Sequence, residues 1–352
     1  MGVGEAAGLT ATEARAVAMW LADNGFGWGE VEKLCAVGGG TQNIMARFDY
    51  AGESYILRRG PRHLRPRSND TILRECRVLR ALDGADVPHP RLIATCEDAS
   101  VLDGAVFYLM EPVDGFNPSV ELPPLHAGSE AVRHAMCLHL VDALAALGAV
   151  DHRAVGLDGF GKPEGFLERQ VPRWLSELDG YRRYEGYPGV AIPGVDGVAK
   201  WLDQNRPRAW RPGLMHGDFH FANAMFKPDS AEVAAVVDWE MCTIGDPLLD
   251  LGWLLATWQL PAVPGMFGAG LMGTTGLATA HELADRYARA SDRDLNSLSW
   301  YVVLACFKLG IVLEGTHARA CAGQADKRIG DELHRTTLLL FERANDIIKG
   351  DK

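Results

Sequence analysis

The sequence lacks the cysteine pattern of a disulfide framework or a zinc site. Its seven cysteines are scattered and odd in number, and no two are spaced as C-x-x-C, which is typical of reduced thiols in a cytoplasmic protein. The opening residues lack the basic segment and apolar core of a signal peptide. The longest apolar stretch, at 248–260, contains Asp250 and is too short to span a bilayer. We therefore expect a cytoplasmic protein with no membrane partner.

Positive charge is also in short supply. The 352 residues carry a formal net charge of −11, which disfavours a general role in nucleic-acid binding. With 47% hydrophobic and 23% charged residues, the composition is that of a globular protein long enough to bury the cores of two lobes. We find no internal repeat and no long low-complexity segment. Nothing in the composition indicates an oligomeric state.

Strand patterns dominate the first third of the chain, and helix patterns dominate the rest. The expected strands are 34–37, 44–50, 54–58, 91–96 and 105–110, with helices at 10–24 and 70–82. Pro112 blocks continuation of the last strand and marks a linker at 111–115. Helices are then expected at 129–147, 165–178, 195–205, 248–258, 277–290, 296–320 and 328–348. We predict an N-terminal lobe at 1–111 and a helical lobe at 112–352.

The most informative motif is H-G-D-F-H-F-A-N at 216–223, which is followed downstream by Asp238. Its H-x-D-x-x-x-x-N spacing is that of a kinase catalytic loop, in which an aspartate lies beside the attacking hydroxyl while an amide and a second aspartate hold Mg²⁺. Asp218, Asn223 and Asp238 supply these groups in order. An ordinary turn is the alternative, since His, Gly, Asp and Asn all favour turns. The apolar strand at 233–237 argues against a turn, because a carboxylate ending a buried strand is costly unless paired or metal-bound.

Further segments give the chain a family resemblance. They are L-R-R-G-P at 57–61, R-E-x-x-V-L-x-A-L at 74–82 and G-D-P-L-x-D-L at 245–251. Gly217 stands where protein kinases usually carry arginine, and D-W-E at 238–240 replaces D-F-G. With these features the chain resembles the aminoglycoside phosphotransferase and choline kinase superfamily, and in particular the branch of kinase domains fused to acyl-CoA dehydrogenases and their stand-alone bacterial relatives. The resemblance covers 37–256 and implies an α+β, bilobal protein-kinase-like fold, with a small antiparallel N-terminal sheet lobe and a larger helical lobe.

The resemblance also implies a role for each residue of the motif. Asp218 would be the catalytic base that orients the acceptor hydroxyl, and His216 would brace the loop. Asn223 and Asp238 would be ligands of Mg²⁺, a hard cation that prefers oxygen. A glycine-rich turn would fold over the phosphates of ATP, or of GTP as the alternative nucleotide. The residues of that turn are Gly39, Gly40, Thr41 and Asn43.

The chain departs from the wider family at Arg58, where lysine is usual. Arginine keeps the positive charge and grips phosphate with two nitrogens. The branch named above shares this arginine, so the resemblance implies a working clamp with Glu75 as its ion-pair partner. Arg59 would point to the opposite face of the strand. Glu111 and Val113 would contact adenine through backbone groups.

Several other side chains have two open interpretations. The arginine run at 58–67 is either a solvated loop or a patch for a polyanionic acceptor such as the phosphates of an acyl-CoA. Asp246 and Asp250 are expected to be structural, since an acid is favoured where a helix begins. Glu240 either approaches the metal or bonds a neighbouring amide. His220 is expected on the loop surface, with the wall of an acceptor pocket as its alternative.

These patterns predict an ATP-dependent kinase that transfers the γ-phosphate to a hydroxyl group of a small molecule. The acceptor is open: an acyl-CoA-like compound or hydroxy acid, a sugar, a choline-like amine or an aminoglycoside. The mixed charge of the chain after residue 322 does not call for a polycation, so the aminoglycoside is the less favoured acceptor. A nucleotide-binding pseudokinase with a regulatory role is the alternative class. Arg58 invites that alternative, and the complete set of Asp218, Asn223 and Asp238 counts against it.

Overall fold

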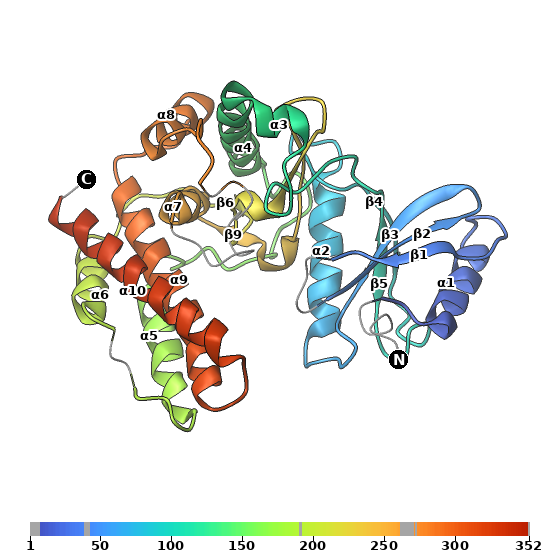
Figure 1. The fold of residues 1–352 in the computed structure, drawn as a ribbon, viewed down its shortest axis with the longest axis horizontal. Coiled ribbons are helices and arrows are strands. Elements are labelled where there is room, and N and C mark those ends of the chain that lie inside the picture. Colours follow the sequence, from blue (N-terminus) through green and yellow to red (C-terminus); the bar gives the residue numbers. More distant parts are fainter. Residues whose placement is uncertain (1–7, 39–42, 190–191, 261–270, 272, 351–352) are drawn as a thin grey trace. The chain divides into compact units, whose positions relative to one another are not determined.

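The computed structural model describes residues 8–38, 43–189, 192–260, 271 and 273–350. The chain divides into two compact units. The N-terminal unit is Met1–Asp114 together with Val237–Glu240, and the C-terminal unit is Gly115–Val236 together with Met241–Lys352. Figure 1 labels most of their helices and strands. The short return of the chain into the N-terminal unit carries Asp238.

A five-stranded antiparallel sheet forms the core of the N-terminal unit, in the order β1-β2-β3-β5-β4. Its strands are β1 (Glu32–Ala36), β2 (Ile44–Tyr50), β3 (Glu53–Arg59), β4 (Leu92–Cys96) and β5 (Phe107–Met110). Successive side chains of a strand point to opposite faces. One face carries Phe48, Leu57 and Phe107, which pack with Val17 and Leu21 of helix α1 (Ala11–Asp23). This apolar layer holds β3, the strand that carries Arg58, in place.

Helix α2 (Ser68–Leu82) packs against β3, β4 and β5. Arg58 and Tyr108 are register partners on β3 and β5, and both bond Glu75 of α2. Arg59, the next residue along β3, instead lies 2.5 Å from Glu13 of α1 through its Nη1. The alternation of the strand therefore separates two adjacent arginines, as the sequence pattern predicts.

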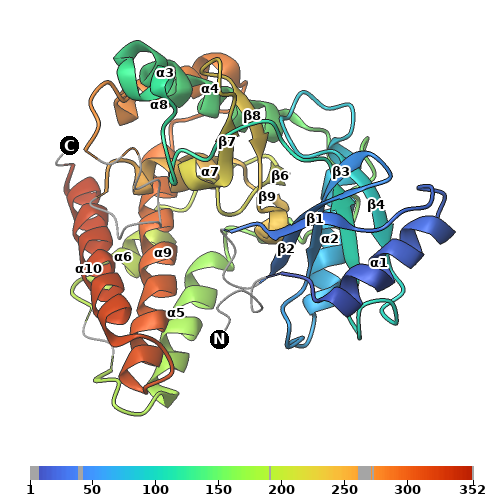
Figure 2. The ribbon, with the colours of Figure 1, turned by 45° about the vertical axis from the view of Figure 1, so that its right-hand side comes forward.

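Helices make up most of the C-terminal unit. They are α3 (Pro124–Gly128), α4 (Glu130–Ala149), α5 (Gln170–Gly180), α6 (Val195–Gln204), α7 (Leu248–Thr257), α8 (Ala280–Ala290), α9 (Leu298–Cys321) and α10 (Lys327–Lys349). Helix α9 contacts α5, α6, α7 and α10, and Figure 2 shows it between its neighbours. It is therefore the central helix of this unit.

Two small ladders flank the H-x-D motif. Strand β6 (Gly213–Met215) pairs with β9 (Thr243–Gly245), and β7 (Ala224–Phe226) pairs with β8 (Val233–Val236). The motif at 216–223 is thus the connection between β6 and β7. Both of its ends are held by antiparallel pairing, which limits the conformations open to the loop.

In the part of the chain that the structure describes, α4 and α9 are long and apolar enough to cross a membrane by length and composition alone. The most apolar 18-residue segment of α9 is 83% buried inside the structure, and that of α4 is 56% buried. Such burial is typical of core helices. Helix α9 is a longer apolar segment than the 248–260 stretch singled out from the sequence, and it contains Lys308 in its interior.

Gly252 of α7 allows a test of the packing between α7 and α9. An added Cβ would lie 2.6 Å from the backbone carbonyl of Tyr301, which cannot move aside as a flexible side chain would. We expect Gly252→Ala to lower the free energy of unfolding by about 1–3 kcal/mol, the usual cost of overpacking. Gly197 of α6 is the matched control, because nothing lies within 4 Å of its added Cβ. Gly197→Ala should stabilise by about 0.5–1 kcal/mol, and equal effects in urea denaturation would contradict this packing.

Candidate active site

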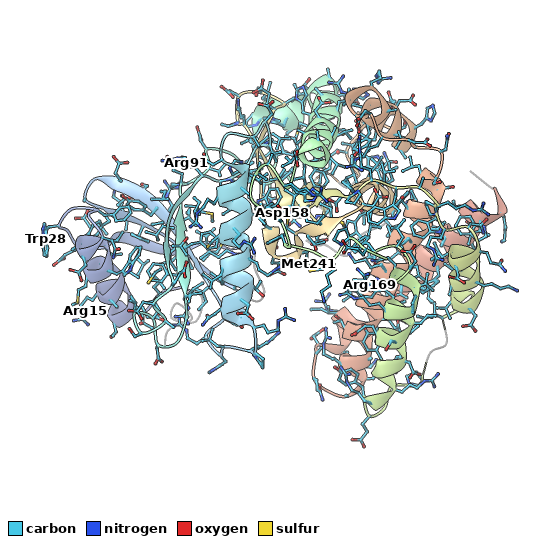
Figure 3. All side chains as sticks on the ribbon, turned by 180° about the vertical axis from the view of Figure 1, so that it is seen from behind. Arg15, Trp28, Arg91, Asp158, Arg169 and Met241 are labelled. Carbon is cyan, nitrogen blue, oxygen red and sulfur yellow. The ribbon has the colours of Figure 1, made fainter. Side chains whose placement is uncertain are left out.

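The backbone of the β6–β7 loop turns at Gly217. This residue has a φ of +89°, and an added Cβ would lie 2.5 Å from the carbonyl oxygen of Met241. Met241, labelled in Figure 3, is 45% exposed, but its backbone is in the way of any side chain at 217. Glycine is therefore required here by conformation and by space. This is a physical reason for glycine where protein kinases usually carry arginine.

A buried carboxylate holds the same turn from behind. Asp250 of α7 accepts a hydrogen bond from the backbone N–H of His216 at 2.6 Å and another from Gly217 at 2.8 Å. The His216 ring is fully buried, and its Nδ1 accepts the backbone N–H of Asp218 at 3.3 Å. His216 thus braces the loop from within, and Asp250 fixes the loop to α7.

Lys308 of α9 also supports this loop, and no sequence motif predicted it. Its Nζ donates to the carbonyl oxygen of Gly217 at 3.1 Å and lies 4.3 Å from the ring centroid of Trp253. Burial lowers the pKa of Lys308, and the carboxylates of Asp218 and Asp250 act against that effect. The signal that was available is a single lysine inside the apolar segment 298–313, because a lysine is rarely buried without a partner.

The side chain of Asp218 projects from the loop and is 33% exposed. Its Oδ2 accepts a hydrogen bond from Asn223 Nδ2 at 3.2 Å, and its Oδ1 lies 3.4 Å from His220 Nε2. Burial would raise the pKa of Asp218, but the hydrogen bond from His220 and the nearby His216 and Lys308 hold it well below its usual range. Asp218 is therefore a carboxylate at neutral pH, ready to accept a hydrogen bond.

Asn223 is oriented by the same residue. Its Nδ2 donates to the main-chain oxygen of Asp218 at 2.9 Å as well as to the carboxylate. With Nδ2 committed in this way, Oδ1 is the atom that the amide offers to a cation. The short distance between Asp218 and Asn223 along the chain is enough to bring them together, which is why the spacing of the motif is informative.

Asp238 lies in the N-terminal unit, where Arg58 binds it. Arg58 Nη2 lies 2.7 Å from Asp238 Oδ1 and 3.3 Å from Glu75 Oε1. Its Nε is 2.9 Å from Glu75 Oε2 without hydrogen-bond geometry, so that contact is an ion pair. Asp238 has a φ of +68°, a left-handed conformation that a residue other than glycine adopts at a cost. Its carboxylate is 37% exposed.

The Arg58 cluster is rich in charge. Burial would lower the pKa of Arg58, but Glu75, Tyr108 and Asp238 hold it above its ordinary value, so the guanidinium stays charged. Burial raises the pKa of Glu75, and the charge of Arg58 opposes that rise. Tyr108 Oη donates to Glu75 Oε2 at 2.8 Å. The expected pairing of Arg58 with Glu75 is thus present in the N-terminal unit.

The structure describes only some of the other residues predicted to contact the nucleotide. Gly39, Gly40 and Thr41 lie outside the described residues. Asn43 Nδ2 donates to Glu240 Oε2 at 3.2 Å, and Glu240 Oε2 also lies 3.7 Å from Arg58 Nη2. Glu240 thus bonds an amide, as one of its two interpretations expects, and its approach to a metal stays a prediction.

The structure shows which backbone groups at 111 and 113 are open to a purine. The backbone N–H of Glu111 already donates to the carbonyl oxygen of Arg91 at 3.0 Å, and the two side chains form an ion pair. Only the carbonyl of Glu111 remains for a purine. Val113, which is half-buried, follows two residues later.

A cavity of about 290 Å³ opens in the C-terminal unit beside His220. Its apolar wall is formed by Phe221, Leu254, Trp258, Leu271 and Leu277, and its polar groups belong to His220, Thr257, Gln259 and Thr274. Within the described ranges no carboxylate lines it. His220 is only 8% exposed, so the expectation of a loop-surface histidine was wrong. Residues of α7, together with Leu271, Thr274 and Leu277, line the same cavity, and they are distant from residue 220 in sequence.

The remaining predicted residues either have a structural role or do not gather at one place. Asp246 accepts the backbone N–H of Leu248 at 3.1 Å at the start of α7 and a hydrogen bond from Tyr301, as expected for a helix-opening acid. The arginine run does not form one exposed patch, because Arg58 and Arg59 are buried on opposite faces of β3 and Arg62 pairs with Glu13 at 2.7 Å.

Comparison with known proteins identifies the family. The model APH, described as the phosphotransferase enzyme family, matches residues 33–294. The chain belongs to this family. Mouse acyl-CoA dehydrogenase family member 10 is 32% identical over 303 residues, which are 84% of this chain and 27% of that protein. The chain thus spans about a quarter of the length of this relative, and the predicted resemblance to the branch fused to acyl-CoA dehydrogenases is confirmed.

Solved structures of phosphotransferases share the fold. A protein of Ralstonia eutropha JMP134, provisionally assigned as an aminoglycoside phosphotransferase, matches with a TM-score of 0.77 and 28% identity over 94% of this chain and 98% of that chain. APH(4)-Ia, in ternary complex with AMP-PNP and hygromycin B, matches with a TM-score of 0.56 and 16% identity over 92% of this chain and 99% of that chain. The predicted α+β kinase-like fold is confirmed.

The support of the loop by Asp250 predicts a pH dependence of stability. Burial raises the pKa of Asp250 from its ordinary 3.8 to about 7, against the hydrogen bonds from Gly217 and His216. A carboxyl whose pKa is raised on folding stabilises the fold below its unfolded pKa, and this contribution is lost as the pH rises through the folded pKa. Between pH 4 and 7, the free energy of unfolding of the wild type should fall by up to about 4 kcal/mol relative to Asp250→Asn.

Urea denaturation of both proteins across this pH range makes the measurement. The comparison uses the pH dependence of the difference, because the other titrating groups are common to the two proteins. A difference that stays constant with pH would mean that Asp250 remains ionised in the core throughout.

Proposed function

We propose that the protein is an ATP-dependent small-molecule kinase that transfers the γ-phosphate to a hydroxyl group, with Mg²⁺ as the metal. Asp218 is the observation that carries this proposal. It is an ionised, partly exposed carboxylate on a loop pinned by Asp250 and Lys308. Its neighbour His220 also lines the cavity, so an acceptor in the cavity is within reach of the carboxylate.

Asp218 orients the acceptor hydroxyl and accepts its proton late in the reaction. The acceptor hydroxyl donates a hydrogen bond to the carboxylate, which directs a lone pair of the oxygen at the γ-phosphorus. Because the pKa of Asp218 lies below its usual range, it is a weak base, and the proton moves to it as the new O–P bond forms and the bond to the ADP oxygen breaks. Asn223 Nδ2, 3.2 Å from Oδ2, keeps the carboxylate in place.

The nucleotide is held by the N-terminal unit in this proposal. The glycine-rich turn at 38–43 covers the phosphates, Arg58 supplies positive charge to them, and the carbonyl of Glu111 and the backbone of Val113 meet the purine. These backbone contacts do not favour adenine strongly, so GTP remains the alternative to ATP. The contact between Asn43 and Glu240 fixes one end of the turn.

Asn223 Oδ1 and the carboxylate of Asp238 are the ligands proposed for Mg²⁺. Both offer oxygen, the donor that Mg²⁺ prefers, and the Asp238 carboxylate is 37% exposed. Arg58 engages its Oδ1, which leaves Oδ2 for the ion. When bound, Mg²⁺ would neutralise charge on the transferred phosphate.

The cavity favours an acceptor with an acyl chain, such as a hydroxy acid or an acyl-CoA-like hydroxyacyl compound. Five of its lining side chains are large and apolar, and those of His220, Thr257 and Gln259 can bond a hydroxyl or carbonyl. A polycationic aminoglycoside would meet no carboxylate among the described lining residues. The relative that is named an acyl-CoA dehydrogenase family member points to the same class of acceptor.

A nucleotide-binding pseudokinase with a regulatory role is the second candidate, and one observation favours it. The ion pair with Arg58 engages one oxygen of Asp238, a carboxylate that an active kinase uses for its metal. The intact loop around Asp218 favours the enzyme, because a binding module needs no such carboxylate.

Release of ADP from Mg-ATP tests the proposal. Hydroxyacyl-CoA esters and free hydroxy acids should stimulate the wild type, whereas kanamycin and hygromycin B should not. Asp218→Asn should lower the stimulated rate by at least about 100-fold, since it removes the group that aims the acceptor. Asp229→Asn, in the exposed turn after β7, is the matched control and should retain full activity.

Two results would redirect this assignment. Tight ATP binding with no turnover on any hydroxylated acceptor would support the pseudokinase. Stimulation by the aminoglycosides alone would keep the kinase and replace the acyl acceptor.

The adjacent arginines of β3 provide a separate test of the clamp. Arg58→Lys replaces a fork that touches both Glu75 and Asp238 with a single nitrogen, and we expect kcat/KM for ATP to fall by about 10- to 100-fold. Arg59→Lys, on the opposite face and paired with Glu13, should change it by less than about 3-fold. Equal losses in the two variants would mean that the effect is one of folding.

A further inference from the structure

A cluster of metal-ligating side chains lies between α9 and α10, apart from the residues assigned above. Glu314 and His317 are one turn apart on α9, and His334 faces them from α10. One ligand atom from each of the three lies within 4.8 Å of those of the other two. The spacing Glu-x-x-His places both α9 residues on the same face of the helix.

Glu314 is the buried centre of the cluster, with its side chain 1% exposed. Tyr187 Oη donates to Glu314 Oε1 at 2.8 Å, and His334 Nδ1 lies 2.7 Å from Glu314 Oε2. A buried carboxylate needs partners of this kind. A hydroxyl on one carboxylate oxygen and an imidazole beside the other is also the arrangement that surrounds a metal-binding carboxylate.

His317 is less well satisfied. Its ring stacks on that of His334, with centroids 4.5 Å apart and planes 24° from parallel. Its buried Nδ1 has no hydrogen-bond partner among the described residues, and the nearest carboxylate oxygen, Asp331 Oδ1, is 3.6 Å away. The neutral imidazole is the form of histidine that binds metals.

We propose that Glu314, His317 and His334 form a binding site for a divalent transition metal of the zinc type, which joins α9 to α10. Two imidazole nitrogens and one carboxylate oxygen suit Zn²⁺, with Asp331 or water as a fourth ligand. The ion takes the place of the proton between His334 Nδ1 and Glu314 Oε2, and the neutral ring of His334 then carries its proton on Nε2. In a tetrahedral site with bonds near 2.0 Å the ligand atoms lie about 3.3 Å apart, so His334 Nδ1 and Glu314 Oε2, now 2.7 Å apart, must separate slightly to admit the ion.

The alternative is an ordinary ion pair between Glu314 and His334 with a histidine stacked on it. That alternative satisfies Glu314 but leaves His317 Nδ1 without a partner. A metal satisfies all three groups at once. Because α9 also carries Lys308, which bonds the catalytic loop, an ion here would stiffen the helix that supports the loop.

The test uses the full chain, purified without a histidine tag, stripped of metal and kept in excess Mg²⁺ so that hard-cation sites are filled. Co²⁺ absorption and Zn²⁺ calorimetry then report on the proposed site. We expect one equivalent bound, with a visible Co²⁺ ligand-field spectrum. His317→Gln and His334→Gln should each weaken Zn²⁺ binding by at least about 100-fold, and Tyr187→Phe, which removes the partner of a ligand, by about 10- to 100-fold.

His281→Gln is the matched control, since His281 is an exposed histidine 3.4 Å from Asp285, and it should bind Zn²⁺ as the wild type does. Circular dichroism of each metal-free variant checks that it folds. No Co²⁺ bound by the wild type would overturn the proposal. Unchanged binding in the folded His317→Gln variant, or a Co²⁺ spectrum dominated by thiolate charge transfer, would also overturn it.

Discussion

The buried carboxylate of Asp250 is the contact on which the loop at 216–223 depends. A loop that leaves a strand presents backbone N–H groups with no ladder partner, and burying them unpaired is costly. Asp250 accepts two of them, from His216 and Gly217. The carboxylate itself loses hydration, and Lys308 lessens that cost from α9 while it bonds Gly217. The position of Asp218 is therefore set by α7 and α9 as much as by the loop itself.

A second constraint acts in the N-terminal unit. Arg58 is charged and buried, and one of its nitrogens contacts Glu75 and Asp238 together. This arrangement holds Asp238 in a left-handed conformation, which costs about 1–3 kcal/mol for a residue other than glycine. Such a conformation persists only where neighbouring contacts enforce it. The arginine therefore does more than replace the charge of a lysine, because its fork reaches both carboxylates.

The sequence predicts what short-range spacing controls. The motif at 216–223 predicted that Asp218 and Asn223 share one loop, and strand alternation predicted that Arg58 and Arg59 face apart. Lys308 was missed because it meets Gly217 only when α9 packs against the loop. The burial of His220 and the engagement of the Glu111 N–H by Arg91 depend on segments distant along the chain or across the sheet. No periodicity reports such contacts.

The same difference between local spacing and long-range contacts explains why the sequence predicts the reaction better than the acceptor. Phosphoryl transfer needs a few groups at fixed spacing, and a contiguous motif can encode them. The proposed acceptor cavity instead takes its wall from Phe221 of the loop, from the end of α7 and from Leu271, Thr274 and Leu277, so no local pattern describes it. That wall is mostly apolar, and an apolar wall selects by burial at about 0.8 kcal/mol per CH₂ group. Selection of this kind discriminates the length of an acyl chain, whereas a polycationic ligand would require carboxylates.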